Sequence, residues 1–326
     1  MQRALAQVWR YFDPADYAHA VLRDAPLDNG RITVERVEHV PLLRELHHIR
    51  DARINLINQG LVDDLAFLRD APPLTTVLQV EASQPVDLAP LSSCPALEIV
   101  DVLRGEVSSG WEVLSALPAL SWLDINLPDG GRDLSFLARC PSLTAVVLYG
   151  CTELSDLSML VSVSSRLRYV NLRDAKRIRD LSALTGLSDL TSLIIEGAPL
   201  VNGVAAVIPI LDRLKEFGVW SVPTATSLQA VSGSSLQEIN LADCPITDWA
   251  SLATLQSLTK VWLRDFPTVD LAPLAALPHL RDLILMSIEE PVDLSPLARI
   301  DHRLRVKLNN TSTVGATGSL VKVQRL

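Results

Sequence analysis

The chain has 326 residues, of which 57 are Leu, whereas Phe, Trp and Tyr contribute only 5, 6 and 4. Its formal net charge of −9 argues against non-specific electrostatic binding to nucleic acid or to an anionic membrane surface. An excess of one aliphatic residue, with 20 scattered Pro, is typical of a protein built from stacked repeats rather than of two globular domains.

Residues 1–30 precede the regular part of the chain and carry apolar Leu5, Val8, Trp9 and Phe12 at helical spacing. A stacked array leaves a hydrophobic end that must be covered, so we expect these residues to form a small helical cap or linker. They contain no apolar run of the length that a signal peptide needs, and a cytoplasmic location is therefore expected. No other segment has the uninterrupted apolar length of a membrane span.

A D-L-x-x-L segment recurs from Asp64 onward, with steps of 22 to 24 residues between copies. The clear copies begin at Asp64, Asp87, Asp133, Asp156, Asp180, Asp248, Asp270 and Asp293. Degenerate copies at Gly110, Gly203 and Thr226 fill the gaps and give eleven tandem units. Two imperfect units precede them, so the predicted array spans residues 31–310. Residues 311–326 are expected to form a tail or an end cap.

A second segment, L-x-x-L-x-L, lies ten or eleven residues into most units, first at Leu97 and last at Leu280. Because side chains alternate along a strand, its fourth and sixth places should point into the core and its third, fifth and seventh places outward. The D-L-x-x-L segment predicts a short helical or 3₁₀ turn with Asp as its N-cap. Capping also explains why Asp recurs once in each unit.

These two segments resemble the short-unit leucine-rich repeats of internalins and protein-phosphatase regulators. The resemblance implies an α/β repeat fold: a curved solenoid with a concave parallel β-sheet and short helical or 3₁₀ turns on the convex side. It breaks down at the Asn position after the strand, so the polar ladder of that turn must be replaced by packing and water. The residues found there instead are Gly105, Pro128, Cys151, Ala175, Ala198, Val222, Cys244, Phe266 and Ile288.

Motifs for catalysis are missing from the sequence: it has no GxxxxGK, GxGxxG, GxSxG or HExxH segment. The six His residues are scattered without metal-ligand spacing. The four Cys, at positions 94, 140, 151 and 244, fall at repeated structural places and are interpreted as buried thiols. We therefore expect no enzyme activity, no cofactor and no metal.

The outward places of the strands hold five of the ten Trp and Tyr residues, more than proportional placement gives. Trp and Tyr are enriched at binding hot spots, so we expect a protein or peptide ligand on the concave sheet. Trp111 and Trp249 instead replace a core Leu. The predicted partner-binding residues are Trp122, Tyr149, Tyr169, Arg173, Glu196, Glu216, Trp220, Glu238, Lys260, Trp262 and Arg264. The three Glu in successive units favour a partner with a mixed or locally basic surface.

The opening QRALAQVWRYFDPADYAHAVL, followed by repeats, also resembles the sensor region of bacterial NACHT-type signalling NTPases. This resemblance implies an antiviral-defence role, in which the array senses a foreign component and an NTPase domain belongs to the same full-length protein. The alternative is a free-standing cytosolic adaptor or regulatory scaffold. An adhesin-like surface protein would require a secretion signal. An enzyme is the least favoured class.

Overall fold

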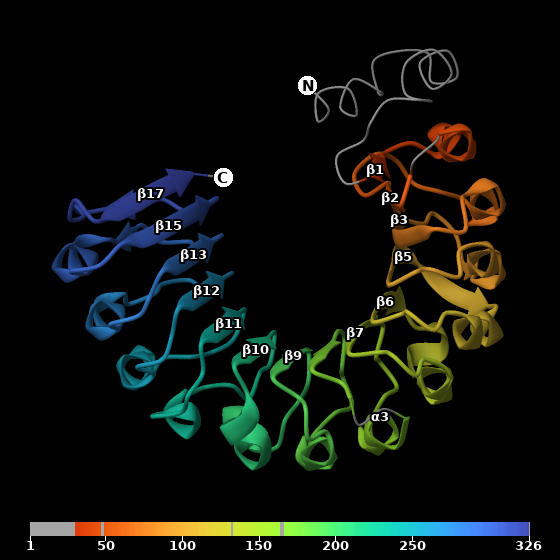
Figure 1. Ribbon diagram of the computed structural model, residues 1–326. Coiled ribbons are helices and arrows are strands. Elements are labelled where there is room, and N and C mark those ends of the chain that lie inside the picture. Colours follow the sequence, from red (N-terminus) through yellow and green to blue (C-terminus); the bar gives the residue numbers. More distant parts are fainter. Residues whose placement is uncertain (1–29, 47–48, 132, 164–165, 326) are drawn as a thin grey trace. The chain divides into compact units, whose positions relative to one another are not determined.

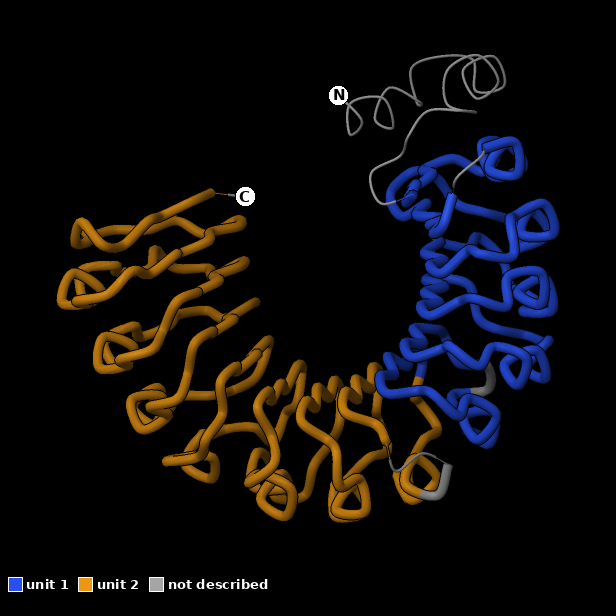
Figure 2. The backbone as a smooth tube through the Cα atoms, in the orientation of Figure 1, with its two compact units in different colours: residues 1–150, 162–164 blue, residues 151–161, 165–326 orange. Residues whose placement is uncertain are grey.

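The computed structural model describes residues 30–46, 49–131, 133–163 and 166–325. The chain divides into two compact units, which are treated separately (Figure 2). Unit 1 comprises residues 1–150 and 162–164, and unit 2 comprises residues 151–161 and 165–326. The helical cap predicted in residues 1–30 lies, apart from Gly30, outside the described residues. No helix in the described part of the chain is both long and apolar enough to span a membrane.

Unit 1 is an array of parallel strands that follow one another in chain order (Figure 1). Its strands are β1 (Arg31–Val34), β2 (Asp51–Asn55), β3 (Thr75–Glu81), β5 (Ile99–Ser109), β6 (Trp122–Asn126) and β7 (Ala145–Tyr149), with the short β4 (Val86–Asp87) beside β5. Its 3₁₀ helices are Val37–His39, Pro41–Glu45, Ala66–Asp70, Ala89–Ser93, Trp111–Ala116, Pro128–Gly131 and Ser135–Arg139.

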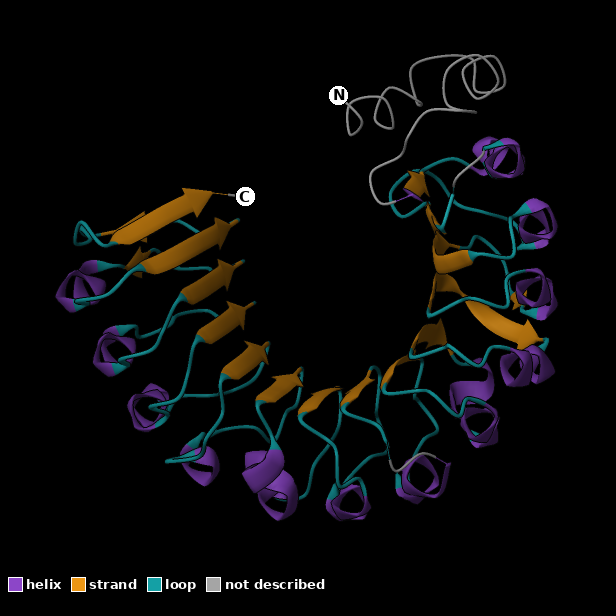
Figure 3. Cartoon of the chain, viewed as in Figure 1, coloured by secondary structure: helices purple, strands orange, loops and turns teal. Residues whose placement is uncertain are grey.

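Unit 2 continues the same pattern, with its strands along the inner side of its arc and its turns along the outer side (Figure 3). The strands are β8 (Tyr169–Leu172), β9 (Ser192–Glu196), β10 (Glu216–Trp220), β11 (Glu238–Ala242), β12 (Lys260–Arg264), β13 (Asp282–Met286), β15 (Leu304–Asn309) and β17 (Val321–Arg325). The turns are Ser182–Gly186, Gly203–Arg213, Gln229–Val231, Trp249–Thr254, Ala272–Ala276 and Ser295–Arg299. Residues 158–161 of the α-helix α3 (Ser158–Val163) also belong to unit 2, and a two-stranded pair, β14 (Val292–Asp293) with β16 (Thr313–Val314), completes it.

The strands form where the L-x-x-L-x-L segments predict them, and neighbouring strands of the described residues pair in parallel, as Phe217 with Ile239 and Leu241 with Leu263 illustrate. Inward residues such as Leu123 and Leu263 are fully buried. The core of each unit is therefore a set of aliphatic columns that run from repeat to repeat, which is how a repeat lacking a core of its own is stabilised.

The repeated Asp residues fix the start of the turns. Asp248 holds the N-cap position as predicted, whereas most of the others lie one residue earlier. Asp180 Oδ1 accepts the backbone N–H of Ser182 at 2.9 Å, whereas the N-cap position itself is held by Leu181. The same bond, from the N–H two residues on, is made to Asp64, Asp87, Asp133, Asp156, Asp270 and Asp293. Each is an Asx-turn, which orients the free N–H groups that open the 3₁₀ helix.

The turn after each strand relies on packing in place of an Asn ladder, as expected. Cys151, Ala175 and Val222 are fully buried there, and the N–H of Ala175 is donated to the Glu196 carbonyl of the next repeat at 2.8 Å. All four Cys are buried and none is in a disulfide, and burial raises the pKa of the Cys140 and Cys151 thiols to about 12. These thiols fill space and stay protonated at neutral pH.

Two features depart from the regular repeat. Strand β5 runs for 11 residues because, after a register shift between Val102 and Glu106, it pairs again with β6 and with the short β4. Beyond residue 310 the chain adds β17, which pairs in parallel with β15. Trp249 is buried against Phe266, and Trp111 is half-buried with its ring centroid 4.3 Å from that of Phe136.

Candidate functional site

Aromatic side chains gather on the outward side of the strands of unit 2, which we call its strand face. Trp220 of β10, Ile194 of β9 and Ala242 of β11 form a buried group, and Tyr169 and Trp262 pack against it. The ring centroids of Trp220 and Trp262 lie 5.0 Å apart at an interplanar angle of 81°. We call these five residues, together with Arg173 and Arg264, the Trp220 cluster.

Small residues explain why two rings from non-adjacent strands meet. Ala242 is the register neighbour of both Trp220 and Arg264, so the strand between the two rings carries only a methyl group at that level. Gly218 leaves space on β10 itself, where an added Cβ would lie 3.1 Å from the Ile194 side chain. The alternation of small and large outward residues therefore creates a depression that the Trp220 indole fills.

Two guanidinium groups cover the Trp220 ring. The Arg173 Cζ lies 3.8 Å from the ring centroid, and the Arg264 Cζ lies 5.0 Å from it and 5.5 Å from the Trp262 centroid. These distances are those of cation–π contacts. Arg173 also pairs with Glu196 at 2.7 Å, and Arg264 Nε lies 2.9 Å from an Asp265 oxygen. The carboxylates thus hold the guanidinium groups in place over the indole.

Trp220 occupies an outward place, as predicted, but it does not face solvent. Its side chain is only 4% exposed, because Arg173, Arg264 and Trp262 cover it. Its indole N–H is buried and has no hydrogen-bond acceptor among the described residues. Trp262 is half-buried, and its N–H is donated to the Met286 sulfur at 3.0 Å. Of the two rings, Trp262 is the one that a partner can touch without rearranging the face.

The three Glu residues predicted to form an acidic strip are mostly neutralised within the face. Glu196 is bound to Arg173, and Glu238 pairs with Lys260 at 2.9 Å. Glu216 instead accepts hydrogen bonds from the Ser192 hydroxyl and from Asn240 Nδ2. A partner therefore meets compensated charges at most of this surface, and Glu216 is held by neutral donors alone.

Neither a family model nor a curated protein matches the chain. Among solved structures, an internalin (inlF) from Listeria monocytogenes matches with a TM-score of 0.51 at 19% identity, covering 95% of this chain and 92% of that one. An internalin C2 from the same organism gives 0.39 at 21% identity, with 68% and 83% covered. A TLR13–ssRNA13 complex gives 0.45 at 14% identity, with 91% and 50% covered. The chain has the leucine-rich-repeat fold. Only the first likeness bears on that conclusion, and at this identity it concerns the fold alone.

The other predicted partner-binding residues of this leucine-rich-repeat fold lie in unit 1. Trp122 opens β6 and is in register with Ala145, whereas Tyr149 closes β7 and is in register with Asn126. The two rings are thus at opposite ends of neighbouring strands, and the register does not pair them. The strand face of unit 2 brings predicted site residues into one cluster.

Buried polar residues at the outward places are what the sequence reasoning missed. Asp101, Asp124, Asn171, Ser192 and Asn240 are all buried although they point outward. All except Ser192 occupy the fifth place of the strand segment, between the outward residues of the third and seventh places. A short polar residue at the fifth place is therefore a sequence signal for a buried polar side chain on the strand face.

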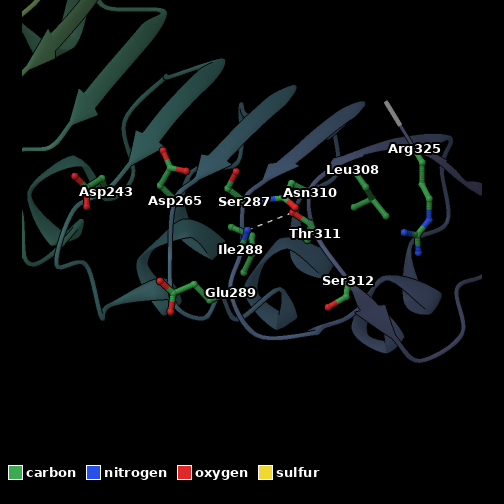
Figure 4. A pocket seen from close by; sticks show the side chains of 10 residues that line it. All are labelled: Asp243, Asp265, Ser287, Ile288, Glu289, Leu308, Asn310, Thr311, Ser312 and Arg325. Atoms are coloured by element: carbon green, nitrogen blue, oxygen red, sulfur yellow. Dashed lines mark hydrogen bonds between the residues drawn. The ribbon is translucent and has the colours of Figure 1, made fainter.

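A separate hollow of about 770 Å³ lies in unit 2, where strands end (Figure 4). It includes four residues with left-handed backbone, Asp243, Asp265, Ser287 and Asn310, at φ values of 46°, 57°, 52° and 45°. Across it, the N–H of Ile288 is donated to the Thr311 hydroxyl at 3.3 Å. No group of three His, Cys, Asp or Glu able to hold a metal ion occurs among the described residues. The hollow is polar and lacks the aromatic side chains of the Trp220 cluster.

Proposed function

We propose that the protein is a non-catalytic recognition module that binds a protein or peptide through the strand face of unit 2. The observation that carries this proposal is the Trp220 cluster, which places two indoles and two guanidinium groups on an outward surface while the core is already filled by aliphatic residues. Trp, Tyr and Arg are the residues that dominate binding energy at protein interfaces. Trp262 is the contact residue, and buried Trp220 supports it from below.

A peptide-display selection on the full chain tests this proposal. Peptides that bind the wild type are titrated by calorimetry against Trp262→Ala and against Ile208→Ala, whose side chain is 55% exposed on the turn side of the same unit. Trp262→Ala should weaken binding by about 2 kcal/mol or more, because a central ring is lost. Ile208→Ala should bind like the wild type. The reverse pattern would assign binding to the turn side.

We further propose that the module is the sensor region of a NACHT-type NTPase acting in antiviral defence. The support is the resemblance of residues 1–30, with the repeat array that follows them. The absence of a disulfide among the four Cys is compatible with a reducing, cytoplasmic compartment. The alternative is a free-standing cytosolic adaptor. Sequencing the gene upstream of Met1 separates the two, because the first requires an encoded GxxxxGK segment in frame.

A further inference from the structure

Asp101 occupies an unusual position in unit 1. It lies at an outward place of β5, in register with Gln79 of β3 and Asp124 of β6. Despite pointing outward, it is only 8% exposed, and so is Asp124. On β5 itself it is flanked two residues away by Ile99 and Leu103, both half-buried and apolar. The carboxylate therefore lies on the strand face of unit 1 between two half-buried aliphatic side chains.

The hydrogen bonding of Asp101 is incomplete. One carboxylate oxygen accepts a single bond, from Gln79 Nε2 at 3.3 Å, and the other has no partner among the described residues. Arg104, on the same strand, is bound to Glu81 at 2.8 Å instead. No ion pair of the described residues includes Asp101. Burial, and secondarily the charge of Glu81, raise the pKa of this carboxyl to about 6. It is thus still mostly ionised at neutral pH, and a buried carboxylate left without a cation is costly.

The groups that face Asp101 define what could bind there. From β3 they are Gln79 and Glu81, and from β6 they are Trp122 and Asp124. These neighbours contribute carboxylates, an amide and an indole but no basic group. A ligand that fits must bring a positive charge with hydrogen-bond donors at the end of an apolar stem, so that the stem contacts Ile99 and Leu103 and the charged head reaches the carboxylate. Lys and Arg side chains have this form.

We infer that Asp101 is a binding site for a lysine or arginine side chain of a partner protein. The unbonded carboxylate oxygen accepts the ammonium or guanidinium N–H, and Ile99 and Leu103 contact the methylene stem. The ion pair would offset the burial of the carboxylate, because a charged hydrogen bond in a water-poor site is stronger than one at the surface. This site is independent of the Trp220 cluster, so it does not rest on the function proposed for unit 2.

A small cation tests the site without knowledge of the partner. The probe is Nα-acetyl-lysine N-methylamide, and its matched control is the same molecule acetylated at Nε, which keeps the stem and removes the charge. The readout is the ¹³C carboxyl resonance of Asp101 in the full chain, assigned by its loss in Asp101→Asn. The charged probe should shift this resonance saturably and lower its titration midpoint, because a bound cation favours the carboxylate. No shift, or an equal shift with the neutral control, would overturn the proposal.

Variants separate a binding role from a structural one. Asp101→Asn keeps the shape and removes the charge, so it should abolish the perturbation that the probe causes at neighbouring Gln79 while raising the melting temperature. Asp70→Asn, an equal charge change at an exposed position of unit 1, should leave both unchanged. A lower melting temperature in Asp101→Asn would mean that the carboxylate is a structural acceptor, and the proposal would fail. A response to calcium chloride but not to the amine would also overturn it, in favour of a metal ion.

Discussion

The strand faces of the two units differ in how their outward charged side chains are neutralised. Each must expose the outward side of a parallel sheet, whose every second residue cannot reach the core. In unit 2 the charges are compensated locally, as in the pair of Arg173 with Glu196, and a large ring is buried beneath them. In unit 1 Asp101 is buried with one hydrogen bond and no cation among the described residues. A shared core thus does not impose a shared surface chemistry.

The largest effect should come from the core, where the two units are alike. Leu123 in unit 1 and Leu263 in unit 2 are both fully buried at inward places. Replacing either by Ala removes buried methyl groups and leaves a cavity, so each variant should lose about 2 to 5 kcal/mol of unfolding free energy. Urea denaturation followed by circular dichroism measures the loss. If only one of the two were costly, the cores of the units would not be equivalent.

The next effect tests whether the strand face of unit 2 contributes to stability. Trp220 is buried beneath two guanidinium groups and Trp262, so Trp220→Ala should cost about 3 kcal/mol, as for a core aromatic. Trp262→Ala should cost less, because that ring is half-buried. Thermal and urea unfolding of both variants provides the comparison. Equal and small losses would mean that Trp220 behaves as a surface side chain after all.

On the strand face of unit 1, a substitution at Asp101 should raise the unfolding free energy instead of lowering it. Burial raises the pKa of Asp101 above its ordinary value, to about 6, so the folded state binds its proton more tightly than the unfolded state does. The resulting stabilisation is fully present below the unfolded pKa and is lost as pH rises through about 6. That loss is worth up to about 3 kcal/mol by pH 7. Asp101→Asn should remove it, so variant and wild type should differ more at pH 7 than at pH 4. A constant difference would contradict the shift.

Much of the fold follows from the sequence because periodic spacing is a strong signal. Eight D-L-x-x-L segments and the strand segments between them fix the register, and with it the inward Leu columns. Spacing also predicts which residues point outward, and Trp220 and Trp262 are among them. The burial of those residues does not follow, because it depends on neighbours from other repeats.

The candidate site illustrates this limit. That Trp220 is covered depends on Gly218 and Ala242, which leave room for the ring, and on Arg173, which comes from a strand two repeats away. The burial of Asp101 has the same origin, because it depends on Gln79 and Asp124 of the neighbouring repeats as well as on its place in its own strand. Outward positions must be compared across three neighbouring repeats before their exposure can be predicted.

The smallest predicted effect concerns the turns, where the two units again agree. Asp133 in unit 1 and Asp180 in unit 2 each accept the backbone N–H of the Ser two residues on, at 2.8 and 2.9 Å. Replacing either by Ala should cost about 1 kcal/mol, as for the loss of a capping residue. The bonds from this Ser lower the pKa of both carboxyl groups.

The pH dependence of these turns is opposite to that of Asp101. A carboxyl group with a lowered folded pKa adds stability that is present above its unfolded pKa and is lost as pH falls through the folded value. Wild type and Asp180→Ala should therefore differ at neutral pH and converge in acid, whereas wild type and Asp101→Asn should differ at neutral pH because the wild type is the less stable. Measuring both variants across one pH series distinguishes the two kinds of Asp. If the Asp180→Ala difference persisted unchanged in acid, the carboxylate would not be the group that fixes the turn.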